Sequence, residues 1–182
     1  KIATLIGAQP EEVLVCESTS TNLFKLATAA IRVMPDRPII ISDALNFPSD
    51  LYILQGIVDT LNERNQEANF QLKLIPSRDD ITIDQQDLKK AVDQNVALLS
   101  LTHVAFKSAF MYDMAQVTHF AHQHGALTLW DLSHSVGAVP LRLNKWNVDL
   151  AVGCTYKYLN GGPGSPAFLY VRKDLQSKLI SP

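Results

Sequence analysis

The sequence contains few cysteines, no long apolar run and no excess of charge of one sign. Only two of its 182 residues are cysteine, Cys16 and Cys154, and they match no metal-binding or redox spacing. We therefore expect two reduced thiols rather than a disulfide framework. The longest apolar stretches, such as 96–101 and 150–152, are far too short to span a membrane, and no charged-then-apolar signal pattern begins the chain. The expected location is the cytoplasm.

The charge balance excludes several classes of partner. The chain has 16 Lys and Arg against 18 Asp and Glu, which gives a net charge of −2, and its basic residues form no cluster. We expect neither a nucleic-acid surface nor a basic membrane patch. Hydrophobic residues make up 47% of the chain, enough to bury a core, and no Pro-, Gly- and Ser-rich linker divides it. We expect one domain over residues 1–182.

Three histidines lie close together in the sequence, at His119, His122 and His124. They fall late in an amphipathic helical pattern that begins near Asp113, where an imidazole has an ordinary electrostatic role at the helix C-terminus. We therefore expect no metal site.

Short apolar runs alternate with helical patterns along the chain. Such alternation predicts an α/β fold with a mostly parallel sheet flanked by helices, and each run resembles a strand buried on both faces. One helical pattern follows Ser20, and further helix starts are expected at Asp84 and Asp113. The expected strands are 13–16, 38–42, 70–75, 96–101, 126–130, 149–153 and 166–171.

Polar segments follow five of these predicted strands. Ligands of parallel sheets bind at the carboxyl ends of the strands, so all five segments are candidates for one site. The segments are 17–20, 43–50, 102–103, 131–134 and 155–157.

Lys157 is an unusual residue at its position, because it ends an apolar strand and is followed by the glycine-rich turn 160–164. A poorly hydrated lysine there can become the nucleophile that holds an aldehyde cofactor as a Schiff base. The alternative is a surface lysine in a loop. Asp131 also ends an apolar run, and its carboxylate needs a donor such as a pyridinium N–H. As an alternative, Asp131 caps the next turn through Ser133 or His134.

Two segments carry a resemblance to a known family. DLSHSVGAVP at 131–140 and DLAVGCTYKYLNGGPG at 149–164 closely resemble kynureninase, a pyridoxal-phosphate enzyme of the aspartate aminotransferase fold. Segments 16–24 and 46–50 extend the resemblance over nearly the whole chain, and it is strongest to the bacterial branch. The resemblance implies the three-layer α/β/α large domain of that fold.

The resemblance implies a role for each of several residues. Lys157 would hold pyridoxal 5'-phosphate as a covalent aldimine and carry the substrate α-proton, while Asp131 would pair with the pyridine nitrogen and His134 would support that pair. Tyr156 would lie beside the phosphate and relay a proton. Phe47 would stack on the pyridine ring.

Further cofactor contacts are expected from residues of types that are also common at helix caps and strand ends. Thr19 and Ser20 stand where the family binds phosphate, and the helix N-terminus expected near Ser20 is itself an anion site. Asp50 and Thr102 would also line the cofactor, yet a helix cap at 48–50 and an ordinary strand end account for them equally well. The full set of cofactor-binding candidates is Thr19, Ser20, Phe47, Pro48, Ser49, Asp50, Thr102, Asp131, His134, Tyr156 and Lys157.

Segment 105–110 (AFKSAF) departs from the family pattern, where a polar residue, Tyr or Phe, Lys or Arg and then Thr-Gly are expected. Substrate contacts from this loop are therefore in doubt. The cofactor positions are unaffected.

The implied reaction is hydrolysis of L-kynurenine to anthranilate and L-alanine by a homodimer with shared active sites, and a preference for 3-hydroxykynurenine stays open as an alternative. Family members are longer, with an amino-terminal segment and a carboxyl-terminal domain, so these 182 residues are expected to be a fragment. Two alternatives stay open. One is a cysteine desulfurase or another class V aminotransferase-like enzyme, although those typically place His before the lysine and Gln near position 134. The other is a non-catalytic dimerising domain that retains the fold.

Overall fold

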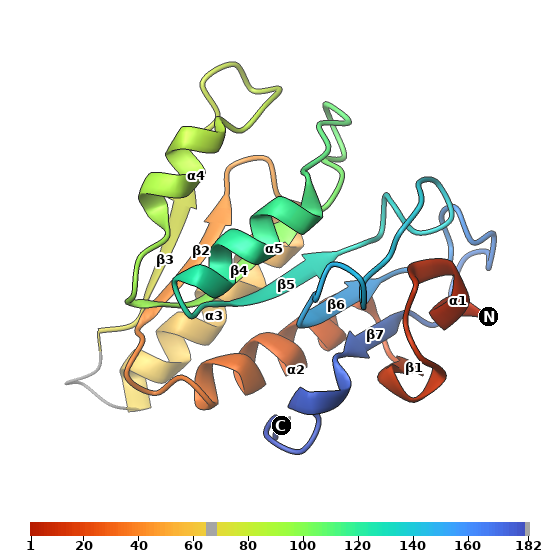
Figure 1. Cartoon of the computed structure of the whole chain (residues 1–182), viewed down its shortest axis with the longest axis horizontal. Coiled ribbons are helices and arrows are strands. Elements are labelled where there is room, and N and C mark those ends of the chain that lie inside the picture. The colour runs from red at the N-terminus through yellow and green to blue at the C-terminus, as the bar shows by residue number, and fades with distance from the viewer. Residues whose placement is uncertain (65–68, 181–182) are drawn as a thin grey trace.

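Seven strands form one mixed sheet in the computed structural model, which describes residues 1–64 and 69–180 (Figure 1). The order across the sheet is β1-β7-β6-β5-β4-β2-β3. Strands β2 to β6 run parallel, and β7 is antiparallel to both of its neighbours. The strands are β1 (Val13–Val15), β2 (Ile39–Asp43), β3 (Gln71–Ile75), β4 (Val96–Thr102), β5 (Leu127–Asp131), β6 (Leu150–Gly153) and β7 (Phe168–Val171). The mostly parallel α/β fold expected from the alternating pattern is confirmed.

Helices cover both faces of the sheet and give three layers (Figure 1). One apolar core lies under α1, α4 and α5, and a second lies under α2, α3 and the short helix η2. The helices are α1 (Ile2–Ile6), α2 (Thr19–Arg32), α3 (Pro48–Arg64), α4 (Gln85–Ala91) and α5 (Met114–Gln123), with 3-10 turns η1 (Pro10–Glu12) and η2 (Lys173–Leu175). No helix within the described ranges combines the length and apolar character that crossing a membrane requires.

The strands differ in burial according to their place in the sheet. Every residue of β2, β4, β5 and β6 is buried, as expected for parallel strands covered on both faces. The same prediction is wrong for β1 and β3, the two edge strands, where Leu14 is 58% exposed and Leu74 is also exposed. An apolar run indicates that a strand is present. It does not indicate whether the strand lies at the centre or at the edge of the sheet, and this position determines how exposed its side chains are.

Side-chain caps begin three of the helices. The Ser18 hydroxyl accepts the amide of Thr21, so α2 starts at Thr19, earlier than the start near Ser20 expected from the apolar pattern. Asp84 and Asp113 cap α4 and α5 as expected, by accepting the amides of Gln86 and Gln116.

A buried polar cluster ties the amino ends of the central strands. The Asp149 carboxylate, before β6, accepts the amide and hydroxyl of Thr128 on β5 at 2.8 and 2.9 Å. His122 Nε2 lies 2.7 Å from Asp149 Oδ2, so this histidine is engaged in the cluster. Arg172 Nη1 forms an ion pair with Asp149 Oδ1 at 2.9 Å and donates its hydrogen bonds to Asn147 O and Oδ1. One carboxylate thus joins β5, β6, α5 and the end of β7.

Candidate active site at the carboxyl edge of the sheet

Strands β4 and β5 end side by side and place two predicted site residues together. Thr102 and Asp131 are register partners at the last pair of the β4–β5 ladder. Asp131 is only 5% exposed, and its Oδ1 accepts the amide of Ser133 at 2.8 Å. Burial raises the pKa of the Asp131 carboxyl, since it leaves the charged form poorly solvated. The turn-capping contact foreseen as an alternative is therefore present, and it uses one of the two carboxylate oxygens.

The amine of Lys157 reaches this carboxylate region from the turn that follows β6. Its Nζ lies 2.9 Å from His134 Nε2, a hydrogen bond between side chains from two different loops. Burial, followed by the neighbouring Lys157, lowers the pKa of the His134 imidazole, which favours its neutral form. A neutral imidazole can accept a hydrogen bond from the lysine amine.

Close packing of the two loops makes this contact possible. Gly137 has φ +83°, and a Cβ built there would lie 2.9 Å from the carbonyl oxygen of Tyr158. Any side chain at residue 137 would press on the backbone next to Lys157. A glycine is required at this position both for its left-handed backbone and for the close approach.

Asp50 supplies a second buried carboxyl from the first turn of α3. It is 2% exposed, Ser49 Oγ lies 3.4 Å from its Oδ1, and its Oδ2 has no hydrogen-bond partner among the described residues. Burial, reinforced by the nearby charge of Asp131, raises the pKa of Asp50 to about 8. Ionising both carboxyls in one buried region costs free energy, because neither charge is well solvated and the two repel each other. A cationic N–H placed between them would remove that cost.

Two aromatic rings flank the lysine amine. The ring centroids of Phe47 and Tyr156 each lie 5.6 Å from Lys157 Nζ. Phe47 directly precedes α3, so the segment that carries Asp50 also carries this ring. The sequence pattern placed all of these residues after strands, and the structure brings them to one edge.

A cleft of about 420 Å³ lies at the N-terminus of α2. Thr19 and Tyr156 line it together with Ser165, while Ser20 is not among its lining residues in the described chain. The first-turn amides of α2 make this end of the helix suited to an anion. Sequence reasoning missed Ser165, although the residue directly follows the glycine-rich turn and could have been found from that position.

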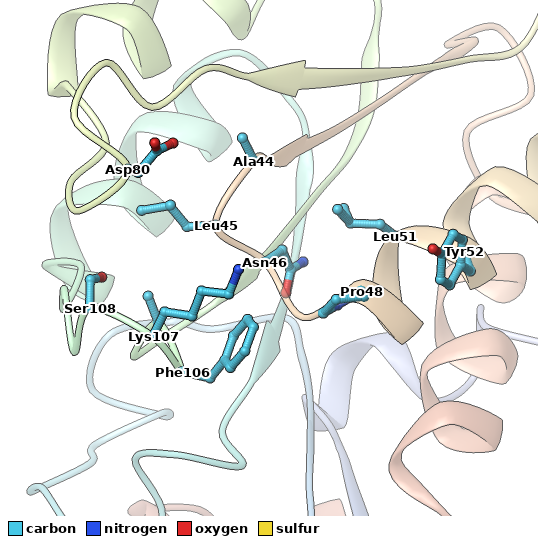
Figure 2. Close-up of a pocket in the computed structure, with 11 residues that line it drawn as sticks. Ala44, Leu45, Asn46, Pro48, Leu51, Tyr52, Asp80, Phe106, Lys107 and Ser108 are labelled. Atoms are coloured by element: carbon cyan, nitrogen blue, oxygen red, sulfur yellow. The ribbon is translucent and has the colours of Figure 1, made fainter.

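A second hollow, of about 440 Å³, opens between the β2–α3 loop and segment 105–108. Figure 2 shows Phe106 and Lys107 pointing toward Asn46 and Pro48 across this hollow. The Phe106 ring packs edge-on against Phe47, with centroids 5.1 Å apart. No sequence pattern indicated this contact, since the two residues are distant along the chain.

Comparison with known proteins defines the family. The Aminotransferase class-V family matches residues 1–182, so the chain belongs to this family. Among solved structures, the apo cysteine desulfurase of Thermococcus onnurineus superimposes with a TM-score of 0.84 at 22% identity, over 98% of this chain and 42% of that chain. A cystine C-S lyase complex superimposes with a TM-score of 0.79 at 15% identity, over 98% of this chain and 46% of that one. At these identities, the structural likeness shows the fold alone.

Sequence similarity within the family points to one group. The chain is 46% identical to kynureninase from Pseudomonas fluorescens over 179 residues, which is 96% of this chain and 40% of that protein. It is also 46% identical to kynureninase from Burkholderia mallei (strain SAVP1), over 100% of this chain and 42% of that protein. The resemblance identified from the sequence is confirmed. The chain spans about two fifths of the length of these relatives.

Proposed function

We propose that the protein to which this chain belongs is a pyridoxal-phosphate-dependent kynureninase. The reaction would be hydrolysis of L-kynurenine to anthranilate and L-alanine, with 3-hydroxykynurenine as a second candidate substrate. The observation that carries this proposal is the Lys157 amine, held 2.9 Å from His134 beside the buried Asp131 carboxyl. The 46% identity to kynureninases over nearly the whole chain supports the choice of substrate.

The residues at the carboxyl edge fit pyridoxal phosphate in three ways. The α2 cleft offers helix amides for the phosphate, with Thr19, Tyr156 and Ser165 around it. The unpartnered Oδ2 of Asp50 and the raised pKa of the Asp131 carboxyl suit a pyridinium N–H, which would satisfy and stabilise a buried carboxylate. The Phe47 ring, whose centroid lies 5.6 Å from Lys157 Nζ, would stack on the pyridine ring. We propose Thr102, Pro48 and Ser49 as further residues around the cofactor.

Each residue then has a chemical task. When bound, pyridoxal phosphate supplies an electron sink for chemistry at the substrate α-carbon. Lys157 would hold the cofactor through its Nζ and, once displaced by substrate, take the α-proton. His134 would accept a hydrogen bond from that amine and orient it. Tyr156 would relay a proton while water adds to the γ-carbonyl and the carbon–carbon bond breaks.

Assembly and location form part of the same proposal. We propose a homodimer with shared active sites, supported by the exposure of Tyr156, which lines the α2 cleft and is 52% exposed. A cytoplasmic location is supported by the two free cysteines, Cys16 and Cys154, which are typical of a reducing compartment.

Borohydride trapping tests the cofactor. After incubation with pyridoxal phosphate and reduction, mass spectrometry of the full-length protein should find a pyridoxyl group on Lys157. Lys157→Arg should lose this label, whereas Lys107→Arg, a matched change at an exposed lysine, should keep it. Absence of label on Lys157 in the unsubstituted protein would refute the assignment.

Anthranilate fluorescence tests the substrate. Adding L-kynurenine should produce anthranilate at a rate proportional to enzyme concentration, while adding L-cysteine should release no sulfide. Sulfide release without anthranilate would instead support a desulfurase of the same fold.

A further inference from the structure

The segment between β4 and α5 folds back on itself as a short hairpin. Val104 and Met111 form an isolated antiparallel bridge, and the amide of Ala105 donates to Phe110 O at 2.9 Å. The amide of Tyr112 donates to His103 O at 3.1 Å, which fastens the end of the hairpin to the end of β4. The loop is therefore held by backbone hydrogen bonds and presents its tip residues at a fixed place.

The hairpin contacts the β2–α3 loop at both of that loop's ends. At one end, the Tyr112 hydroxyl donates to Asp43 Oδ2 at 3.0 Å, and Asp43 Oδ1 accepts the amide of Leu45 at 2.7 Å. At the other end, the Phe106 ring meets the Phe47 ring at an interplanar angle of 78° with centroids 5.1 Å apart. This edge-to-face geometry is a favourable arrangement for an aromatic pair.

Phe47 depends on this contact more than a core residue would. It is 39% exposed, and its ring centroid lies 5.6 Å from Lys157 Nζ. A partly exposed ring can rotate unless a neighbour fixes its plane. Phe106 is the neighbour that can do so: it lines the same hollow as Asn46 and Pro48, the residues on either side of Phe47 in the chain (Figure 2).

We propose that Phe106 is a positioning residue that fixes the plane of the Phe47 ring beside Lys157. This inference rests on the proposed function, in which the Phe47 ring stacks on the cofactor. It assigns a role to the loop that departs from the family pattern. The loop acts on the cofactor through Phe47 and needs no contact of its own with substrate.

Cofactor affinity and the visible circular dichroism of the bound cofactor test this role in the full-length protein. Phe106→Leu should weaken pyridoxal phosphate binding about three- to tenfold, the loss expected when one aromatic pair is removed, and should diminish the dichroic band. Phe106→Met, which fills similar space without a ring, should behave in the same way and serves if the leucine variant folds poorly. Phe106→Tyr should restore both signals.

Phe120→Leu provides the matched control. Phe120 is another half-buried phenylalanine, paired with His124 at 4.5 Å near the C-terminal end of α5 and away from the hairpin. Its loss should lower thermal stability to a similar degree and leave cofactor affinity and dichroism unchanged. If the Phe106→Leu and Phe106→Met proteins bind cofactor like the unsubstituted protein, or if Phe106→Tyr does not rescue, the positioning role is wrong. If the unsubstituted protein takes up no pyridoxal phosphate, the proposed function fails as well.

Discussion

The ionisation of Asp50 and the ionisation of Asp131 depend on each other. The two residues approach from α3 and β5, both are almost fully buried, and each charge disfavours the other. In the cofactor-free protein the pair is best satisfied when one of the two carboxyls keeps its proton. A bound pyridinium would reverse that preference, so the site is prepared for a cation.

The raised pKa of Asp50 gives stability a defined pH dependence. The folded protein holds a proton on Asp50 up to a pKa of about 8, whereas the unfolded chain releases it near the usual value of 3.8. The folded state binds more protons between these values, so the free energy of unfolding of the cofactor-free protein should fall from pH 5 to pH 8, by on the order of a few kcal/mol. Urea titrations at the two pH values measure it. Asp50→Asn should reduce the dependence, with the raised pKa of Asp131 contributing the remainder, and an unchanged slope in this variant would contradict the assignment.

Tyr156 should separate binding from turnover. Removing its hydroxyl takes away a proton relay while the ring stays beside Lys157, so Tyr156→Phe should keep pyridoxal phosphate affinity and lower kcat roughly 100-fold. Absorbance titration and anthranilate fluorescence give the two quantities. Tyr158→Phe, at an equally exposed tyrosine that is not among the residues lining the α2 cleft in the described chain, is the control. Equal turnover in the Tyr156→Phe protein and the unsubstituted protein would rule out the relay.

The sequence indicated which candidate residues lie at the ends of strands better than it indicated their contacts. Thr102, Asp131 and Lys157 follow strands that the apolar runs identify, and the parallel sheet brings strand ends together. The 2.9 Å contact of Lys157 with His134 and the packing of Phe106 on Phe47 depend on loop conformation, which no periodicity reports.

Among the elements, helix α3 contains a glycine that lowers its stability. Gly56 lies inside this helix, and a Cβ built there meets nothing within 4 Å. Because glycine costs up to about 1 kcal/mol relative to alanine in a helix, Gly56→Ala should raise the free energy of unfolding by roughly 0.5–1 kcal/mol. Chemical denaturation measures the change.

Gly137→Ala makes the same substitution as Gly56→Ala, but at a position where a Cβ atom has no room. Its Cβ would press on Tyr158 at a left-handed φ, so the substitution should destabilise the protein and weaken cofactor binding. Similar effects of Gly56→Ala and Gly137→Ala would contradict the local geometry described at both positions.

Strands were the most predictable elements. All seven strands of the sheet were expected within two residues of their observed bounds, because β-branched and aliphatic runs bounded by polar segments are typical of buried strands. The apolar runs do not indicate the order of the strands in the sheet. The exposure of β1 and β3 and the early start of α2, capped by Ser18, therefore had to come from the structure.

At the scale of the whole molecule, the carboxyl ends and the amino ends of the parallel strands hold two different groups of polar residues. The carboxyl edge holds the candidate active site, and the amino edge holds the Asp149 cluster. Asp149→Asn should lower the free energy of unfolding by about 2 kcal/mol, because it removes the charged acceptor of Thr128 while Arg172 keeps its ion pair with Asp174. Pyridoxal phosphate affinity of the folded variant should stay unchanged. A change in that affinity would show that the two edges are coupled.

The pairing of β1 with β7 also bears on how the chain is made. Val13 pairs with Tyr170, so β1 cannot form its hydrogen bonds in the sheet until β7 has been synthesised. At translation rates of about 5–20 residues per second, that delay is roughly 8–30 s. During this time the backbone N–H and C=O groups of β1 have no partner in the sheet, and an unpaired strand of this kind can pair with another chain.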